Sequence, residues 1–237
     1  MKHLLPTSTS AEVRDTNAQV AVLPVGSFEQ HGNYLPLITD TVIAATICDE
    51  LAAVYPLFQL PPLTLSCSHE HSAWPGTVSI SARTLYSLVT DITDSLTRSG
   101  LSAFVLVNGH GGNYTLSNIV QEANAHGTRM ALFPTGPDWN DARTAAGLDS
   151  TMHEDMHAGE IETSILLHAH PELVKDGYEA ADWVADDRRY LLVKGMKGYT
   201  SSGVIGRPSL GSAQKGKAVL NSLVHSFGDV LNVLNQR

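Results

Sequence analysis

A metal-binding pattern is present in the stretch GSFEQHGNYLPLITD, which follows a short apolar run. Glu29 and His31 are two positions apart, so an extended segment projects both side chains to the same side, and Asp40 follows in the same stretch. Two carboxylates and an imidazole make a nitrogen and oxygen ligand set that suits a divalent ion, and a carboxylate can bridge two such ions. The alternative is that Asp40 only caps a helix while Glu29 and His31 are solvated loop residues.

A second candidate loop, VNGHGGN (107–113), places one histidine among glycines directly after another apolar run. Glycines allow the backbone to approach a ligand closely, and they leave amide groups free to face it. His110 is therefore a candidate ligand. The alternative is an ordinary glycine-rich turn that only connects a strand to a helix.

A third stretch, HEDMHAGEIETS (153–164), opens with the zinc-protease pattern H-E-x-x-H. On a helix, His153 and His157 would share one face as zinc ligands, and Glu154 would be the general base. Such a helix is disfavoured because Gly159 follows at once and the preceding GLDSTM has no apolar face. The pattern is therefore weak evidence for a zinc protease.

Substrate recognition is predicted in SCSHEHSAWPGTVS (66–79). Glu70 and His71 offer two polar groups and Trp74 offers a flat apolar surface, a combination that suits a small planar polar ligand. The alternative is that Trp74 packs the loop while its polar neighbours are exposed.

The elements expected to position these loops alternate between strands and helices. Nearly continuous apolar runs predict strands at 20–25, 103–107 and 129–133, and helical spacing predicts helices at 41–55, 81–100 and 113–127. This order predicts an α/β fold with a mostly parallel sheet and a ligand crevice at the carboxyl ends of its strands. The stretch 138–152 lacks clear periodicity and is expected to be a loop that could act as a mobile lid.

Composition limits the classes of protein to consider. The chain has 237 residues, 43% of them hydrophobic and 16% charged, which predicts one domain over residues 1–237. Its 24 acidic and 15 basic residues give a net charge of -9, which argues against a nucleic-acid partner. Neither a signal peptide nor a membrane span is indicated, so we expect a cytoplasmic protein without a membrane partner.

Five motifs, in this order along most of the chain, resemble the creatininase (creatinine amidohydrolase) family. They are LPVGSFEQHGNYLPLITDT, SHEHSAWPGTVSIS, NGHGGN, HAGEIETSILLHAHP and GVIGRPSLGSAQKG. The resemblance implies a three-layer α/β/α sandwich, a binuclear metal centre, hydrolysis of a non-peptide C–N bond and a homohexamer. Zinc is the expected metal, with manganese or iron as alternatives.

The resemblance also assigns residue roles. The implied metal ligands are Glu29, His31, Asp40 and His110, with Asp40 as the bridge between two ions. Creatininase itself has an aromatic residue and a glutamate where this chain has Gly111 and Gly112, so one ligand is missing. We assign Glu162 as the fifth ligand, with Glu160 left as the alternative.

In this family reading, His157 belongs to the signature while His153 and Glu154 fall outside it. His157 is the candidate catalytic proton donor, and its alternative role is a hydrogen bond to a metal ligand. The residues predicted to bind substrate are Glu70, His71, Trp74, Gly111 and Gly112.

The predicted function is hydrolysis of a small cyclic amide, lactam or formamide by a water activated between two metal ions. The first alternative is a peptidase that trims a short precursor peptide, as in the mycofactocin-precursor peptidase, which shares NGHGGN and HAG-x-x-ETS. The second alternative is a metal-stabilised binding protein without turnover.

Overall fold

A parallel sheet forms the centre of the protein in the computed structural model, which describes residues 5–236. Within those residues the strand order is β2-β1-β3-β4, and each neighbouring pair is parallel. The strands are β1 (Val20–Val25), β2 (Leu57–Gln59), β3 (Ala103–Asn108) and β4 (Arg129–Phe133). Because β1 and β3 pair along their whole length, their carboxyl ends lie at the same edge of the sheet.

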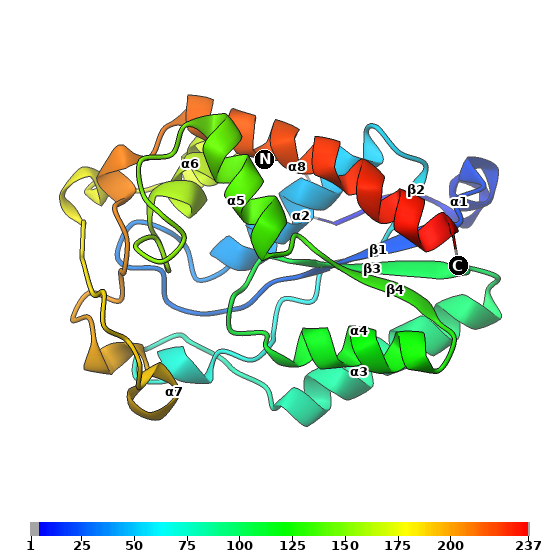
Figure 1. Ribbon diagram of the computed structural model, residues 1–237, viewed down its shortest axis with the longest axis horizontal. Coiled ribbons are helices and arrows are strands. Elements are labelled where there is room, and N and C mark those ends of the chain that lie inside the picture. The colour runs from blue at the N-terminus through cyan, green and yellow to red at the C-terminus, as the bar shows by residue number, and fades with distance from the viewer. Residues whose placement is uncertain (1–4, 237) are drawn as a thin grey trace.

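Helices cover both faces of this sheet and form the three-layer sandwich that the sequence predicted (Figure 1). Above the sheet in that view lie α2 (Thr39–Ala52), α5 (Gly136–Ala146), α6 (Glu160–Ala169) and α8 (Ala213–Asn235), and below it lie α3 (Ala82–Arg98) and α4 (Thr115–Ala125). The short helices are α1 (Ser10–Thr16), α7 (Leu191–Lys194) and single 3₁₀ turns at His69–His71, Pro171–Leu173, Tyr178–Ala180, Met196–Gly198 and Pro208–Leu210. Among residues 5–236, no helix combines the length and the apolarity needed to cross a membrane.

Each face of the sheet has its own apolar core. Val20 and Val22 of β1 pack into the core under α2, α6 and α8, whereas Ala21, Leu23 and Val25 pack into the core with α3 and α4. All six residues of β1 are buried, which explains the nearly continuous apolar run in the sequence. The sandwich therefore holds the end of β1 rigidly from both sides.

The predicted elements are confirmed in type, with boundaries that differ by a few residues. The predicted helix over 81–100 is α3, which begins after Ser81, whose hydroxyl accepts a hydrogen bond from the Thr84 amide. The short strand β2 and the helices α1, α5, α6, α7 and α8 were not predicted.

The expected loop over 138–152 is wrong for its first half, because α5 runs to Ala146. Thr135 and Asp138 form a reciprocal capping box at its start, and Gly147 ends it in the left-handed conformation. Few apolar residues of α5 are buried, so its sequence carries little helical periodicity. The proposed mobile lid is therefore limited to the segment after the helix.

A buried ion pair joins α5 to the start of α6. The Arg143 guanidinium lies 2.7 Å from the Asp155 carboxylate, and both side chains are buried. The same carboxylate accepts hydrogen bonds from the amides of Glu160 and Ile161, in the first turn of α6. Asp155 therefore fixes the entry to the helix that carries Glu162.

Replacing this carboxylate tests its importance for stability. Asp155→Ala should lower the free energy of unfolding by about 3–5 kcal/mol, because it leaves the Arg143 charge buried without its partner. Urea denaturation measures the loss. The matched control is Glu154→Ala, the preceding residue, whose partly exposed carboxylate accepts hydrogen bonds from Thr151 and faces Arg207. An equal loss in both variants would contradict a special role for Asp155.

Candidate metal centre

Three segments bring candidate ligands together at the carboxyl edge of the sheet. Glu29 and His31 follow β1, His110 follows β3, and Asp40 lies in the first turn of α2. Gly109 makes the approach possible, because a Cβ atom there would lie 2.3 Å from the backbone oxygen of Asp40. The glycine before the histidine thus lets the β3 loop contact α2.

Asp40 lies between two imidazole rings. Its Oδ1 is 2.9 Å from His31 Nε2, and its Oδ2 is 3.0 Å from His110 Nδ1. The other nitrogen of each ring contacts a backbone carbonyl: His31 Nδ1 is 3.0 Å from the Glu29 oxygen and His110 Nε2 is 2.9 Å from the Cys67 oxygen. An N–H group facing each carbonyl leaves the nitrogen beside Asp40 free to bind a metal.

The Glu29 carboxylate is fully buried without an aligned hydrogen-bond donor. Its Oε1 lies 3.2 Å from His71 Nε2 and its Oε2 lies 3.2 Å from His110 Nε2, but neither approach has the geometry of a hydrogen bond. Buried carboxylate oxygens in proteins are almost always satisfied. A cation between Glu29 and its neighbours would satisfy both oxygens.

Three sets of side chains have ligand atoms within 4.8 Å of one another among the described residues. One set is Glu29, Asp40 and His110, another is His31, Asp40 and Glu162, and a third combines Glu29, His31 and His157. The structure thus brings all five predicted ligands into one cluster, and Asp40 belongs to two of the sets. These carboxylate and imidazole groups are suitable ligands for divalent metal ions.

Without a metal ion, protons on two histidines compensate the carboxylates of this cluster. Burial raises the pKa of Glu29 to about 8. Burial works against the charged form of His110, but Glu29 and Asp40 outweigh it and raise the pKa of this histidine to about 10. Burial likewise opposes His31, and Asp40 outweighs it to give a pKa of about 9. Metal binding would displace protons from these rings.

Glu162 and Glu160 differ sharply in their surroundings. Glu162 Oε2 accepts a 2.6 Å hydrogen bond from the Ala158 amide and lies 4.0 Å from His31 Nε2. Glu160 points elsewhere: its oxygens accept from the amides of Asp149 and Ser150 and from the Lys215 ammonium group. Both oxygens of Glu160 are therefore occupied by hydrogen bonds that stabilise the fold, whereas Glu162 faces the cluster.

His157 lies within the cluster, between two other rings. Its ring centroid is 4.2 Å from that of His31 and 4.3 Å from that of His71. Its Nε2 is 2.7 Å from the Gln30 backbone oxygen, and its Nδ1 is 3.7 Å from Glu29 Oε1. Burial, and then His31, hold the pKa of His157 well below its ordinary value, so the ring is neutral.

The H-E-x-x-H stretch has none of the geometry of a zinc-protease helix. Residues 151–159 form turns and a single bridge, and α6 begins only at Glu160. His153 is exposed and its Nε2 lies 2.8 Å from the Asp186 backbone oxygen. Glu154 accepts hydrogen bonds from Thr151 instead of facing a metal. The zinc-protease alternative is therefore wrong.

The predicted substrate residues separate into two groups. Glu70 and His71 lie at the cluster, with Glu70 Oε1 3.6 Å from His110 Nε2. Gly111 and Gly112 continue the loop of His110, and both line cavities beside it. Trp74 stands apart: its ring centroid is 6.5 Å from that of His71, and Lys197 covers it at 5.3 Å.

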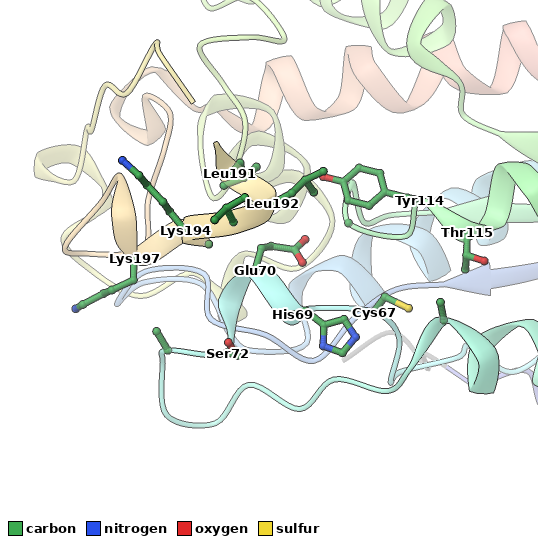
Figure 2. Close-up of a pocket in the computed structure, with 15 residues that line it drawn as sticks. Cys67, His69, Glu70, Ser72, Tyr114, Thr115, Leu191, Leu192, Lys194 and Lys197 are labelled. Carbon is green, nitrogen blue, oxygen red and sulfur yellow. The ribbon is translucent and has the colours of Figure 1, made fainter. Parts of the chain in front are cut away.

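Figure 2 shows the cavity that contains Glu70. It has a volume of about 370 Å³ and is lined by Gly112, Tyr114 and Leu192 among others. The Glu70 carboxylate lies beneath the side chains of α7, while Lys194 and Lys197 extend away from it. Glu70 thus presents a carboxylate to a largely apolar space.

Sequence reasoning missed Gln30, which stands between the predicted ligands Glu29 and His31. Its side chain is buried, and its Nε2 lies 2.8 Å from His71 Nδ1 and 3.1 Å from the Gly203 oxygen. Its position inside the motif FEQHG was the one available signal.

The contrast between the two glutamates is testable. Glu160→Gln should lower the free energy of unfolding by about 1.5–3 kcal/mol, because it weakens charge-assisted hydrogen bonds, and it should leave metal content unchanged.

Burial raises the pKa of Glu160, but Lys215 and Ser150 outweigh burial and hold it below its ordinary 4.5. Its stabilising contribution is therefore present above about pH 4.5 and is lost as the pH falls through the folded-state pKa. Thermal melts from pH 3 to pH 7, with metal analysis, measure both effects; metal loss would contradict this assignment.

Comparison with known proteins identifies the family. The creatininase family, described as creatinine amidohydrolase, matches residues 6–231. A mycofactocin precursor peptide peptidase from Mycobacterium ulcerans is 33% identical over 233 residues, which cover 93% of this chain and 87% of that protein.

A creatinine amidohydrolase (creatininase) structure superposes with a TM-score of 0.81 at 23% identity and covers 98% of this chain and 97% of that one. A creatininase mutant of the Zn-Zn type gives 0.80 at 23% identity, with 98% of each chain covered. At those identities the two structures establish the fold, while the match over residues 6–231 establishes more: the chain belongs to the creatininase family of hydrolytic enzymes.

Proposed function

We propose that this chain is a metal-dependent hydrolase that cleaves a peptide-type amide bond and trims a short precursor peptide. One observation carries the proposal: two separate cavities reach the His110–Gly112 loop, one at Gly112 and the other at His110 and Gly111, so a substrate longer than a small ring has room there. A peptide needs such room, whereas a small ring does not.

The two cavities differ in lining and share the loop. The cavity of about 370 Å³ reaches the loop at Gly112 and carries Glu70. The other, of about 250 Å³, reaches it at Gly111 and is lined by Trp139, Ile161 and Glu162 among others. A side chain at 112 would disturb this arrangement, because its Cβ would lie 1.9 Å from Glu70 Oε1.

Similarity supports the same substrate class. The relative that matches 93% of this chain at 33% identity is named as a precursor peptide peptidase. The sequence reasoning favoured a non-peptide C–N bond and kept a peptidase as its first alternative. The cavities and this relative together favour that alternative.

The metal-binding roles follow the three sets of side chains. Glu29 and His110 would hold one divalent ion, His31 and Glu162 a second, and Asp40 both. Zinc is the proposed metal, with manganese or iron as alternatives, because a mixed set of carboxylates and imidazoles discriminates poorly between them. When bound, such ions supply an activated water and polarise the amide carbonyl.

His157 would carry out the proton transfers of the reaction. Its neutral ring has Nδ1 facing Glu29, with no hydrogen bond to it from the described residues. Nδ1 can accept a proton as water attacks the amide and then donate that proton to the departing nitrogen. This keeps the predicted role of proton donor and adds the step in which the proton is acquired.

A second candidate function is hydrolysis of a small cyclic amide. The observation in its favour is the smaller cavity, whose 250 Å³ volume and aromatic wall at Trp139 suit a compact ring.

A substrate panel separates the two functions. Zinc-loaded protein is incubated with unmodified peptides of three to ten residues and with lactams, cyclic ureides and formamides, and products are read by mass spectrometry. Release of a peptide fragment without ring opening supports the proposal. Ring opening without any peptide cleavage overturns it in favour of the second candidate.

Metal content gives an independent prediction. Purified protein should hold close to two divalent ions per chain, and Asp40→Ala should lose both, because each of its oxygens faces a different set of ligands. The matched control is His153→Ala, which changes a histidine outside the cluster and should keep both ions. Elemental analysis measures the content. An Asp40→Ala variant that still holds two ions per chain would rule out a bridging carboxylate.

A further inference from the structure

The orientation of the Gln30 side chain is fixed by its contacts. Its Oε1 lies 3.0 Å from the Gly32 amide, which can only donate a hydrogen bond. The NH₂ group must therefore be on the other side, where Nε2 lies 3.1 Å from the Gly203 carbonyl oxygen and 2.8 Å from His71 Nδ1. Exchanging the amide oxygen and nitrogen would place two acceptors together at Gly203.

This orientation determines the tautomer of His71. An amide NH₂ group donates and cannot accept, so His71 Nδ1 must present its lone pair to Gln30 Nε2. The proton of the neutral His71 ring is then on Nε2, which lies 3.2 Å from Glu29 Oε1. His71 therefore directs an N–H group toward the cluster.

His157 takes the opposite orientation. Its Nε2 is 2.7 Å from the Gln30 backbone oxygen and 3.2 Å from Gln30 Nε2. The shorter distance, to a carbonyl that can only accept, requires an N–H at Nε2 and makes the longer one a close approach without a hydrogen bond. His157 therefore directs the bare Nδ1 toward the same Glu29 oxygen, at 3.7 Å.

We propose that Gln30 is a positioning residue that sets the Nε2–H tautomer in both His71 and His157. Because the two rings face Glu29 with opposite nitrogens, one presents an N–H group to it and the other a lone pair. Gln30 reaches both rings, using its side chain for His71 and its backbone carbonyl for His157. The consequence for the reaction rests on the proposed function, but the tautomers themselves do not.

The two ring orientations have different uses. The His71 N–H lies near Glu29 Oε1 and attracts it, although the pair is not aligned as a hydrogen bond, and Oε2 is left for the ion that Asp40 and His110 would share. The lone pair of His157 is the proton acceptor that amide hydrolysis requires. The two ring centroids are only 4.3 Å apart, and a single residue thus separates a ligand-orienting histidine from a proton-transferring one.

The glutamine at this position has to be held in place, and Gly203 contributes to that. A Cβ atom at residue 203 would lie 1.8 Å from Gln30 Oε1. The backbone carbonyl of the same residue accepts the second hydrogen of Gln30 Nε2. A glutamate in place of Gln30 has no N–H group for either His71 or Gly203.

Neutron diffraction from the zinc-loaded protein tests the tautomers directly, without any turnover. We expect a deuteron on Nε2 of His71 and on Nε2 of His157, and none on Nδ1 of either ring. A deuteron on His71 Nδ1 would overturn the proposal, whatever reaction the enzyme catalyses. Failure to find a substrate would overturn the proposed function but would leave this result standing.

Substitutions at Gln30 test the consequence. In Gln30→Glu, whose carboxylate accepts, the His71 deuteron should move to Nδ1, and kcat on the best substrate should fall about 10- to 100-fold with KM nearly unchanged. Gln30→Met, which has no polar group, should show the same loss of kcat. The matched control is Gln19→Glu, which adds the same charge at an exposed position and should change neither kcat nor the tautomers.

The two Gln30 variants keep the test decisive if one of them is unstable. Circular dichroism and zinc content establish that a variant is folded and loaded before its kinetics are compared. A folded, loaded Gln30→Met protein with the parental kcat would overturn the positioning role. A loss of zinc from both Gln30 variants, with no Nε2 deuteron on His71 in the parent protein, would also overturn it.

Discussion

The structure depends on the burial of two carboxylates without a lysine or arginine partner. Glu29 and Asp40 are at most 1% exposed, and within residues 5–236 their ionic contacts are all to histidines. Removing a carboxylate from water costs several kcal/mol unless a nearby charge compensates. A divalent metal ion would supply this compensation in place of the protons on His31 and His110, so the cluster is best understood as a metal site.

The fold provides that site through the ends of its elements. The loops after β1 and β3 meet because their strands are neighbours in register, and Gly109 allows the second loop to touch α2. Asp40 and Glu162 both lie in the first turn of a helix, where the positive end of the helix dipole favours a carboxylate. The parallel sheet and two helix starts thus converge on one cluster at the edge expected for α/β proteins.

Much of this could be predicted from sequence because the signals are local. The runs at 20–25 and 103–107 marked strands buried on both faces, and the motifs following them supplied Glu29, His31 and His110. Gln30 was missed because its partners are remote: His157 is 127 residues away and the Gly203 carbonyl is 173 residues away. α5 was missed for another reason, since its apolar stripe is short, with Trp139, Ala142 and Ala146, and the capping box and the buried Arg143 add to it.

The glycine pair after His110 affects both the metal ligands and the substrate. A side chain at 112 has no room in this structure, because its Cβ would lie 1.9 Å from Glu70 Oε1. The carboxylate of Glu70, from a segment 40 residues earlier in the chain, approaches His110 in that space. Gly111 and Gly112 carry no side chain that could be a metal ligand. Each lines a cavity instead, and Glu70 lies on the wall of one of them. Under the proposed function, this arrangement gives up tight enclosure of a small ring and gains the room that a longer amide requires.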